Sequence, residues 1–274
     1  MFLCHPCLSL PAIGISQSRC ELISIIVALK APLAQAQTTR AQVVASNLQN
    51  PWALAFLPDG RFLVTERPGR LRVIEPNGEV GEPILGLPSM VAQGQGGLLD
   101  VLLDTDFAYN KTLYFCFSEP GQGGNSTALA RARLSSDRLR LEELKIIFSQ
   151  KPKVASSAHF GCRIVESQTN GKSDGMLYLT LGDRYSQMND AQTLNNHQGK
   201  IVRIYKDGRV PDNNPFVKRV GSLPEIWSYG HRNVQGAVLS TVSTPLVYRG
   251  QAMIFRINSE SGRSSPRKEA CITG

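Results

Sequence analysis

Residues 52–74 read WALAFLPDGRFLVTERPGRLRVI and establish a pattern that the rest of the chain repeats. Three short runs rich in apolar residues are separated by Pro-Asp-Gly at 58–60 and Pro-Gly at 68–69. Proline presets one dihedral angle of a turn and glycine accepts a positive φ, so each separator predicts a tight turn. Because no amphipathic helix lies between the runs, the segment predicts three antiparallel strands.

The pattern of strand-like runs recurs along the chain. A second set lies at residues 97–103, 112–117 and 128–134, a third at 160–165, 176–181 and 199–204, and a fourth is expected to open at 225–229. Repeats of about 40 to 60 residues made of short antiparallel strands are typical of propeller blades. We therefore predict an all-β fold, an incomplete β-propeller in which residues 43–238 form about four blades.

Two features of the fold stay open at this point. Residues 137–144 are compatible with a helix and equally with a connection between blades. An immunoglobulin-like sandwich is the alternative architecture, which we disfavour because the apolar/Asp-Gly/apolar unit recurs and paired core cysteines are absent. Cys116 lies in an apolar run and is interpreted as a small buried residue, and the Cys-x-x-Cys spacing at 4–7 as chance.

The two ends of the chain differ from the repeated part. Residues 22–29, LISIIVAL, are an apolar run of signal-peptide length, and Ala34-Gln35-Ala36 has the spacing of a signal-peptidase site. The run is too short to cross a membrane. We expect residues 1–37 to be an export signal that directs the chain to the periplasm or outside the cell. Residues 239–274 lose the strand pattern and are expected to be a divergent, disordered tail.

The net charge of the 274-residue chain is +8. A basic protein can bind nucleic acid through its phosphates. Here the basic residues are scattered among the strand-like runs, and no aromatic platform accompanies them. A nucleic-acid partner is therefore not expected.

Polar residues that can carry chemistry lie at the ends of the predicted strands. Gln95 belongs to a Gly-Gln-Gly-Gly turn before a strand, and His159 lies just before another. Asp183 ends a strand, and Arg232 and Asn233 follow one. A neutral imidazole can act as a general base near neutral pH, and Arg and Asn donate hydrogen bonds to carbonyl or carboxylate oxygens. Each residue alone also has an ordinary structural explanation, such as a turn or an exposed ion pair.

Taken in order, several segments resemble one family. They are NPWALAFLPDG at 50–60, GQGGLLDV at 94–101, HFG at 159–161, LGD at 181–183, QGK at 198–200, DNNPF at 212–216 and IWSYGHRNVQ at 226–235. This set resembles the soluble aldose dehydrogenases that depend on pyrroloquinoline quinone (PQQ), in the glucose/sorbosone dehydrogenase family of six-bladed propellers. The resemblance covers residues 43–237 in collinear order.

The resemblance implies a role for each candidate residue. His159 would be the general base that takes the proton from the C1 hydroxyl of an aldose while hydride passes to PQQ, which yields a lactone. Asp183 would orient His159, and Gln95 would lie beside the sugar and this base. Arg232 and Asn233 would bind the oxygens of PQQ and polarise its reactive carbonyl. The implied partners are a sugar and an electron acceptor, and calcium is implied as a second cofactor.

The chain departs from the family pattern at two places. After Gly236 the family continues with Glu-His-Gly-Pro, whose backbone helps to hold calcium, whereas this chain continues Ala-Val-Leu-Ser-Thr, so no metal-binding residue is assigned. Cys162 stands where a glycine usually follows His-Phe-Gly. With about four of six blades, the chain is expected to oxidise sugars poorly by itself. Two other functions stay open: a non-catalytic propeller fragment or binding module, and a calcium-dependent sugar-lactone hydrolase.

Overall fold

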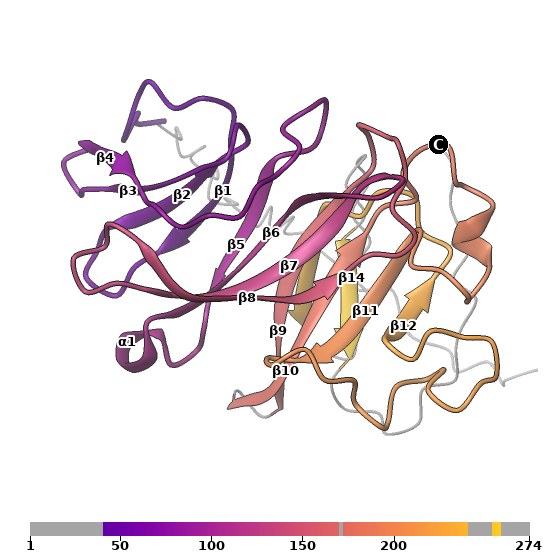
Figure 1. The fold of residues 1–274 in the computed structure, drawn as a ribbon. Coiled ribbons are helices and arrows are strands. Elements are labelled where there is room, and N and C mark those ends of the chain that lie inside the picture. The colour runs from indigo at the N-terminus through magenta and orange to yellow at the C-terminus, as the bar shows by residue number, and fades with distance from the viewer. Residues whose placement is uncertain (1–40, 170–171, 241–253, 259–274) are drawn as a thin grey trace, which may run out of the picture. The chain divides into compact units, whose positions relative to one another are not determined.

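The computed structural model describes residues 41–169, 172–240 and 254–258 (Figure 1). The predicted export signal at residues 1–37 lies outside the described residues, as does most of the segment 239–274 that is expected to be a tail. No helix in the described part of the chain is long and apolar enough to cross a membrane.

Three four-stranded antiparallel sheets follow one another, and within each sheet neighbouring strands are consecutive in sequence (Figure 1). The first contains β1 (Pro51–Phe56), β2 (Phe62–Glu66), β3 (Arg70–Ile74) and β4 (Val80–Pro83). The second contains β5 (Leu98–Leu103), β6 (Thr112–Gly121), β7 (Gly124–Leu134) and β8 (Leu141–Ser149), and the third β9 (Gly161–Thr169), β10 (Lys172–Leu181), β11 (Lys200–Tyr205) and β12 (Ile226–Tyr229). The first strands β1, β5 and β9 contact one another in turn. These are consecutive propeller blades, which confirms the predicted fold class.

The remaining elements are short. A four-residue helix, α1 (Phe107–Asn110), and a 3-10 helix, η1 (Asp190–Gln192), lie in connections between strands. After the third sheet, β13 (Gly236–Ser240) contacts β9 and pairs in parallel with β14 (Ile254–Asn258).

One prediction about a single strand was wrong, and the segment for which a helix and a connection were both left open belongs partly to a strand. Residues 225–229 do not open a fourth unit, because β12 pairs with β11 and completes the third sheet. The long connection between β11 and β12 made this strand look like the start of a new repeat. Residues 137–144 contain no helix, since β8 begins at Leu141 and pairs with β7. Four consecutive residues of β8 are exposed, so its sequence lacks the alternation of a half-buried strand, and backbone pairing defines it instead.

The hydrophobic core consists of layers between successive sheets. Leu63 and Leu71 of the first sheet share one cluster with Phe115 and Phe117 of β6. On the opposite side of β6, Tyr114 and Cys116 pack with side chains of the third sheet. Alternate residues of a strand point to opposite faces, so the second sheet is buried on both sides. This explains why residues 113–117 of β6 are all apolar.

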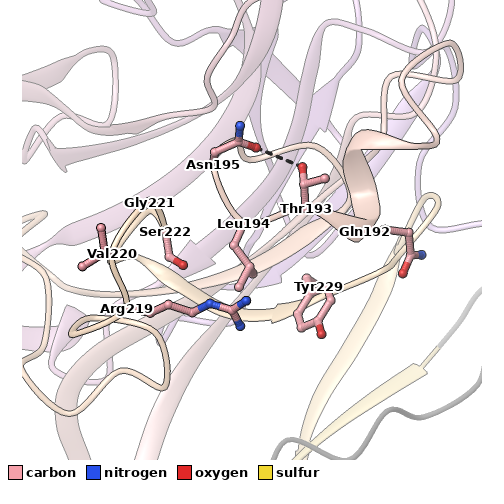
Figure 2. A pocket seen from close by; sticks show the side chains of 9 residues that line it. All are labelled: Gln192, Thr193, Leu194, Asn195, Arg219, Val220, Gly221, Ser222 and Tyr229. Carbon is pink, nitrogen blue, oxygen red and sulfur yellow. Dashed lines mark hydrogen bonds between the residues drawn. The ribbon is translucent and has the colours of Figure 1, made fainter.

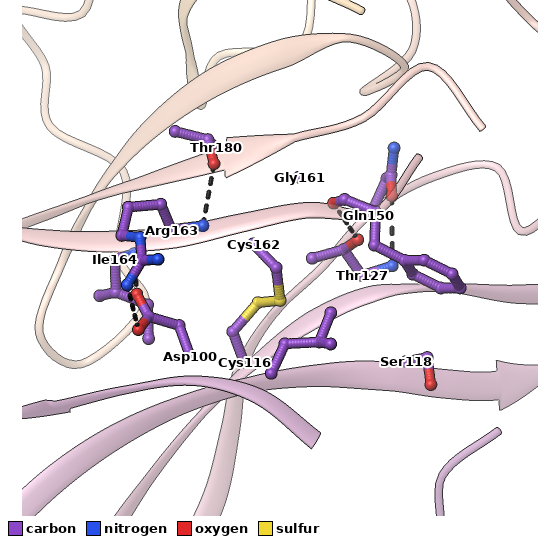
Figure 3. The surroundings of a disulfide bond; sticks show 12 residues. Asp100, Cys116, Ser118, Thr127, Gln150, Gly161, Cys162, Arg163, Ile164 and Thr180 are labelled. Atoms are coloured by element: carbon purple, nitrogen blue, oxygen red, sulfur yellow. Dashed lines mark hydrogen bonds and ion pairs between the residues drawn. A yellow bond between two sulfur atoms is a disulfide. The ribbon is translucent and has the colours of Figure 1, made fainter. Parts of the chain in front are cut away.

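A disulfide bond joins Cys116 of β6 to Cys162 of β9 (Figure 3). Cys116 is fully buried, as interpreted from its apolar run. The argument that paired core cysteines are absent was wrong. Alternation along β6 turns Cys116 towards the third sheet, and this could not be inferred from two cysteines 46 residues apart. The sandwich alternative is excluded for the described sheets by their sequential strand order.

Candidate active site

The five predicted site residues all lie in connections at strand ends. Gln95 precedes β5, His159 precedes β9, Asp183 follows β10, and Arg232 and Asn233 lie between β12 and β13. Strands β9 and β10 are antiparallel and Gly161 pairs with Leu181, so the start of β9 meets the end of β10. This pairing brings His159 and Asp183 side by side, and two hydrogen bonds and an ion pair link the other three residues to the same network.

The imidazole of His159 is bonded to a fully buried carboxylate. His159 Nδ1 lies 2.7 Å from Asp183 Oδ1, and the same oxygen accepts a hydrogen bond of 2.9 Å from the backbone N–H of Tyr185. A carboxylate only accepts, so the neutral ring carries its proton on Nδ1. Nε2 then holds a lone pair, and it has no hydrogen-bond partner among the residues that the structure describes. This is the state that a general base requires.

Arg232 and Asn233 reach the network from the connection after β12. Arg232 Nη1 lies 2.9 Å from Asp183 Oδ2, an ion pair that lacks the geometry of a hydrogen bond. The guanidinium is 39% exposed and offsets the charge of the buried carboxylate. Asn233 Oδ1 accepts a hydrogen bond of 3.0 Å from the backbone N–H of Gly161. The amide nitrogen of Asn233 donates to none of the described residues, so it is free to donate to water or to a ligand.

Gln95 connects the second sheet to the segment that carries His159. Its side-chain oxygen accepts a hydrogen bond of 2.8 Å from the backbone N–H of His159, and its own backbone N–H donates to the carbonyl of Ser157 at 2.8 Å. The neighbouring Gly94 has a φ of +58°, and a Cβ there would lie 2.5 Å from the Ser157 carbonyl oxygen. The glycine in this turn is therefore required by the close approach of two backbones.

Buried amide groups hydrogen-bond to the backbone of the turn that carries Asp183. A Cβ on Gly182 would lie 1.9 Å from the carbonyl oxygen of His159, so the Leu-Gly-Asp segment needs glycine here. The Gly182 carbonyl accepts hydrogen bonds from Gly199 N–H at 3.0 Å and from Gln150 Nε2 at 2.9 Å. Gln150 also donates to Gln198 Oε1 at 2.7 Å. No sequence pattern indicated Gln150.

Sequence reasoning also missed two residues directly after Asp183. Arg184 is fully buried and donates to the carbonyls of Ser156 and Ala158 on the His159 segment, while its guanidinium lies 3.6 Å from the centroid of the Phe160 ring. Burial lowers the pKa of Arg184 to about 10. Arginine is rarely buried, and nothing in the sequence marks this one. It clamps the segment that carries the candidate base.

Tyr185 places an aromatic ring beside the candidate base. Its ring is 61% exposed, meets the His159 ring edge-on with centroids 5.2 Å apart, and lies 5.8 Å from the Arg232 guanidinium. Both Arg184 and Tyr185 have a left-handed backbone, with φ of 57° and 65°. Such strained residues cluster at functional sites, because the surrounding structure has to hold them.

The structure also contains a polar cavity of about 290 Å³ (Figure 2). Tyr229 and Arg219 line it, together with Gln192 from the 3-10 helix. None of the five predicted residues belongs to its lining. In the described part of the chain, no group of three or more His, Cys, Asp and Glu side chains could hold a metal ion.

Comparisons with known proteins place the chain in a family. The model of the family described as Glucose / Sorbosone dehydrogenase matches residues 48–249. The aldose sugar dehydrogenase YliI of Escherichia coli K12 is 40% identical over 227 residues, which are 82% of this chain and 60% of that protein.

Solved structures agree with the sequence relatives. The apo-form of the soluble aldose sugar dehydrogenase from Escherichia coli superposes with a TM-score of 0.67 at 43% identity, covering 71% of this chain and 55% of that one. The PQQ-bound form of an aldose sugar dehydrogenase from Streptomyces coelicolor gives a TM-score of 0.60 at 28% identity, covering 72% and 55%. The chain thus spans between half and two thirds of the length of these relatives. It belongs to the glucose/sorbosone dehydrogenase family.

Proposed function

We propose that the protein takes part in the oxidation of aldose sugars at C1 to lactones, with PQQ as the cofactor. One observation carries the proposal: Asp183 holds His159 by Nδ1 and leaves Nε2 available, while Arg232 lies against the other oxygen of Asp183. A base held in this way has a fixed tautomer and a stabilised cation after it takes up a proton.

In the proposed step, His159 Nε2 takes the proton of the C1 hydroxyl. The imidazolium that forms faces the Asp183 carboxylate at 2.7 Å, which stabilises the new charge. The C1–H bond breaks with its electron pair, and C1 becomes the carbonyl carbon of a lactone. PQQ, when bound, supplies the hydride acceptor.

The chain's own residues fit such a cofactor. The half-exposed Arg232 guanidinium and the Asn233 amide are hydrogen-bond donors beside the base, and the quinone and carboxylate oxygens of PQQ require donors. Tyr185 adds an exposed aromatic ring at the same place. Calcium stays a prediction from the resemblance, because the described residues offer no ligand cluster for it.

The location of the protein is proposed to be the periplasm or the extracellular space. Two observations support this: the apolar run and cleavage-site spacing before residue 37, and the disulfide between β6 and β9. Disulfides persist in oxidising compartments and are rare in the cytosol.

Binding of PQQ to the purified chain, followed by fluorescence quenching, tests the cofactor assignment. We expect Arg232→Ala to weaken binding by about tenfold, because a charge-assisted hydrogen bond is lost. Arg219→Ala removes an exposed arginine that lines the polar cavity, whose lining contains none of the five site residues, and is the matched control. Equal affinity of wild type and Arg232→Ala would count against the assignment.

Oxidation of aldoses with an artificial electron acceptor tests the reaction. We expect any turnover, however slow, to disappear in His159→Ala, because no other described group takes the place of Nε2. Turnover that survives this substitution would overturn the role of His159. Binding of PQQ without turnover would favour a non-catalytic binding module, and hydrolysis of lactones without PQQ would favour the hydrolase alternative.

A further inference from the structure

The disulfide lies at the beginning of the strand that follows the candidate base. Cys116 is in the second strand of one sheet, Cys162 is the second residue of β9, and both are fully buried. Their Cα atoms are 5.9 Å apart, a usual separation for bridged cysteines. Only two residues, Phe160 and Gly161, lie between His159 and Cys162. The bond, drawn in Figure 3, therefore anchors the segment that carries the base.

The backbone of this segment is in an unfavourable conformation. His159, Gly161 and Cys162 have φ values of 52°, 67° and 76°. A left-handed backbone is unfavourable for a residue with a Cβ, and only glycine adopts it freely. The pairing of β9 with β10 also shifts register between Leu179 and Leu181, opposite this turn. The conformation at residue 162 therefore has to be imposed by contacts from outside the segment.

Those contacts come from the second sheet. Thr127 of β7 donates a hydrogen bond of 2.7 Å to the carbonyl of Phe160, and Asp100 of β5 accepts one of 2.7 Å from the backbone N–H of Ile164 (Figure 3). Between these two points, the bond from Cys116 holds Cys162 itself. Three neighbouring strands of the second sheet thus contact the start of β9. Two of these contacts are hydrogen bonds, and the third is the covalent bond to Cys162, whose backbone is left-handed.

We propose that the Cys116–Cys162 disulfide is a positioning element for His159, and that the geometry of His159 against Asp183 depends on the oxidised state of the bond. The inference rests on the proposed function of His159. A dithiol would cleave the bond by thiol–disulfide exchange, which leaves two thiols in the protein and a cyclic disulfide in the reagent. Cys162 is then free to leave its left-handed conformation. The Gly161 N–H, which donates to Asn233 Oδ1, would move together with Cys162. Asn233, a proposed ligand of PQQ, would then be held less firmly.

Two variants separate positioning from simple cross-linking. Cys116→Ala removes the bond and leaves Cys162 with its strained backbone. The double variant Cys116→Ala with Cys162→Gly also lacks the bond, but glycine accepts the left-handed φ without cost. Both are expected to melt about 10 °C lower than the oxidised wild type, because the constraint on the unfolded chain is lost.

The deciding readout is the proton on His159 Nδ1, observed by NMR in the chain without cofactor. Its hydrogen bond to the buried Asp183 predicts a downfield N–H resonance in the oxidised wild type. We expect this resonance to be lost in Cys116→Ala and in wild type treated with dithiothreitol, and to be retained in the double variant. The dissociation constant for PQQ should rise about fivefold in Cys116→Ala and recover in the double variant.

A resonance that persists in folded Cys116→Ala, or one lost equally in both variants, would overturn the proposal. If Cys116→Ala does not fold, the reduced wild type below its melting temperature provides the same comparison, with thiols counted by alkylation and mass spectrometry. The resonance needs no cofactor. If the protein neither binds PQQ nor oxidises sugars, the proposed function is refuted. The Nδ1 resonance would still show whether the disulfide positions His159.

Discussion

The two interfaces between the three sheets are built differently. The first and second sheets meet mainly through apolar side chains, such as Leu63 against Phe115. The second and third sheets share a comparable apolar cluster, but their interface also holds a disulfide and buried polar groups that include Asp100 and Arg184. Apolar packing is non-directional, whereas hydrogen bonds and a covalent bond fix atoms in defined places. The candidate site lies at the second interface, where directional bonds can hold its side chains in defined positions.

The largest expected effect comes from the buried arginine of the second interface. Arg184→Met removes the donor to the buried Asn125 Oδ1 and to the part-buried carbonyls of the His159 segment. A buried acceptor left without a donor costs about 1–3 kcal/mol. We expect the free energy of unfolding to fall by about 4 kcal/mol, measured by urea denaturation. A loss below about 1 kcal/mol would show that water or neighbouring residues satisfy these acceptors. The hydrogen bonds of Arg184 would then contribute little to stability.

The next effect depends on pH. Burial, with a contribution from nearby Lys200, lowers the pKa of His231 to about 4. Between pH 6.5 and 4 the unfolded chain therefore binds a proton that the folded chain does not, so stability is present above pH 6.5 and is lost as pH falls through 4. The loss is about 3 kcal/mol. His231→Gln should flatten the stability curve over this window, and parallel curves for both proteins would contradict the assignment.

This acid sensitivity should be local. The histidines in the described part of the chain, His159, His197 and His231, all belong to the third sheet or its connections. Amide exchange, corrected for its intrinsic pH dependence, should show β10 and β11 losing protection before β2 and β3. Equal loss in all four strands would mean that the two interfaces open together.

The smallest effect is expected at the first interface. Arg138 Nη2 lies 2.7 Å from Asp59 Oδ2, and this ion pair connects turns of the first and second sheets. Both side chains are 37% exposed, so water and salt screen the pair. Arg138→Ala should change the free energy of unfolding by no more than about 0.5 kcal/mol in the same urea experiment. If Arg138→Ala lowered the free energy of unfolding as much as Arg184→Met does, polar contacts would matter equally at the two interfaces.

Much of the fold could be read from local sequence. Period-two runs and Pro-Asp-Gly turns predicted most strands of the three sheets, because alternation and turn chemistry act within a few residues. Strands β8 and β12 were misread for the same reason. The burial of β8 does not alternate, and β12 is separated from its partner by a long connection, so only pairing across the sheet defines them.

For the site, the sequence determined which residues stand at the ends of strands: Gln95, His159, Asp183, Arg232 and Asn233. The family resemblance also implied that Asp183 orients His159. Tertiary structure alone decided that Arg184 is buried under the segment of the base and that Cys116 meets Cys162. The physical reason is the separation along the chain over which each interaction acts. A turn or a strand is set by neighbours in the chain, whereas a contact between sheets depends on which faces meet, and no spacing of residues along the chain encodes that.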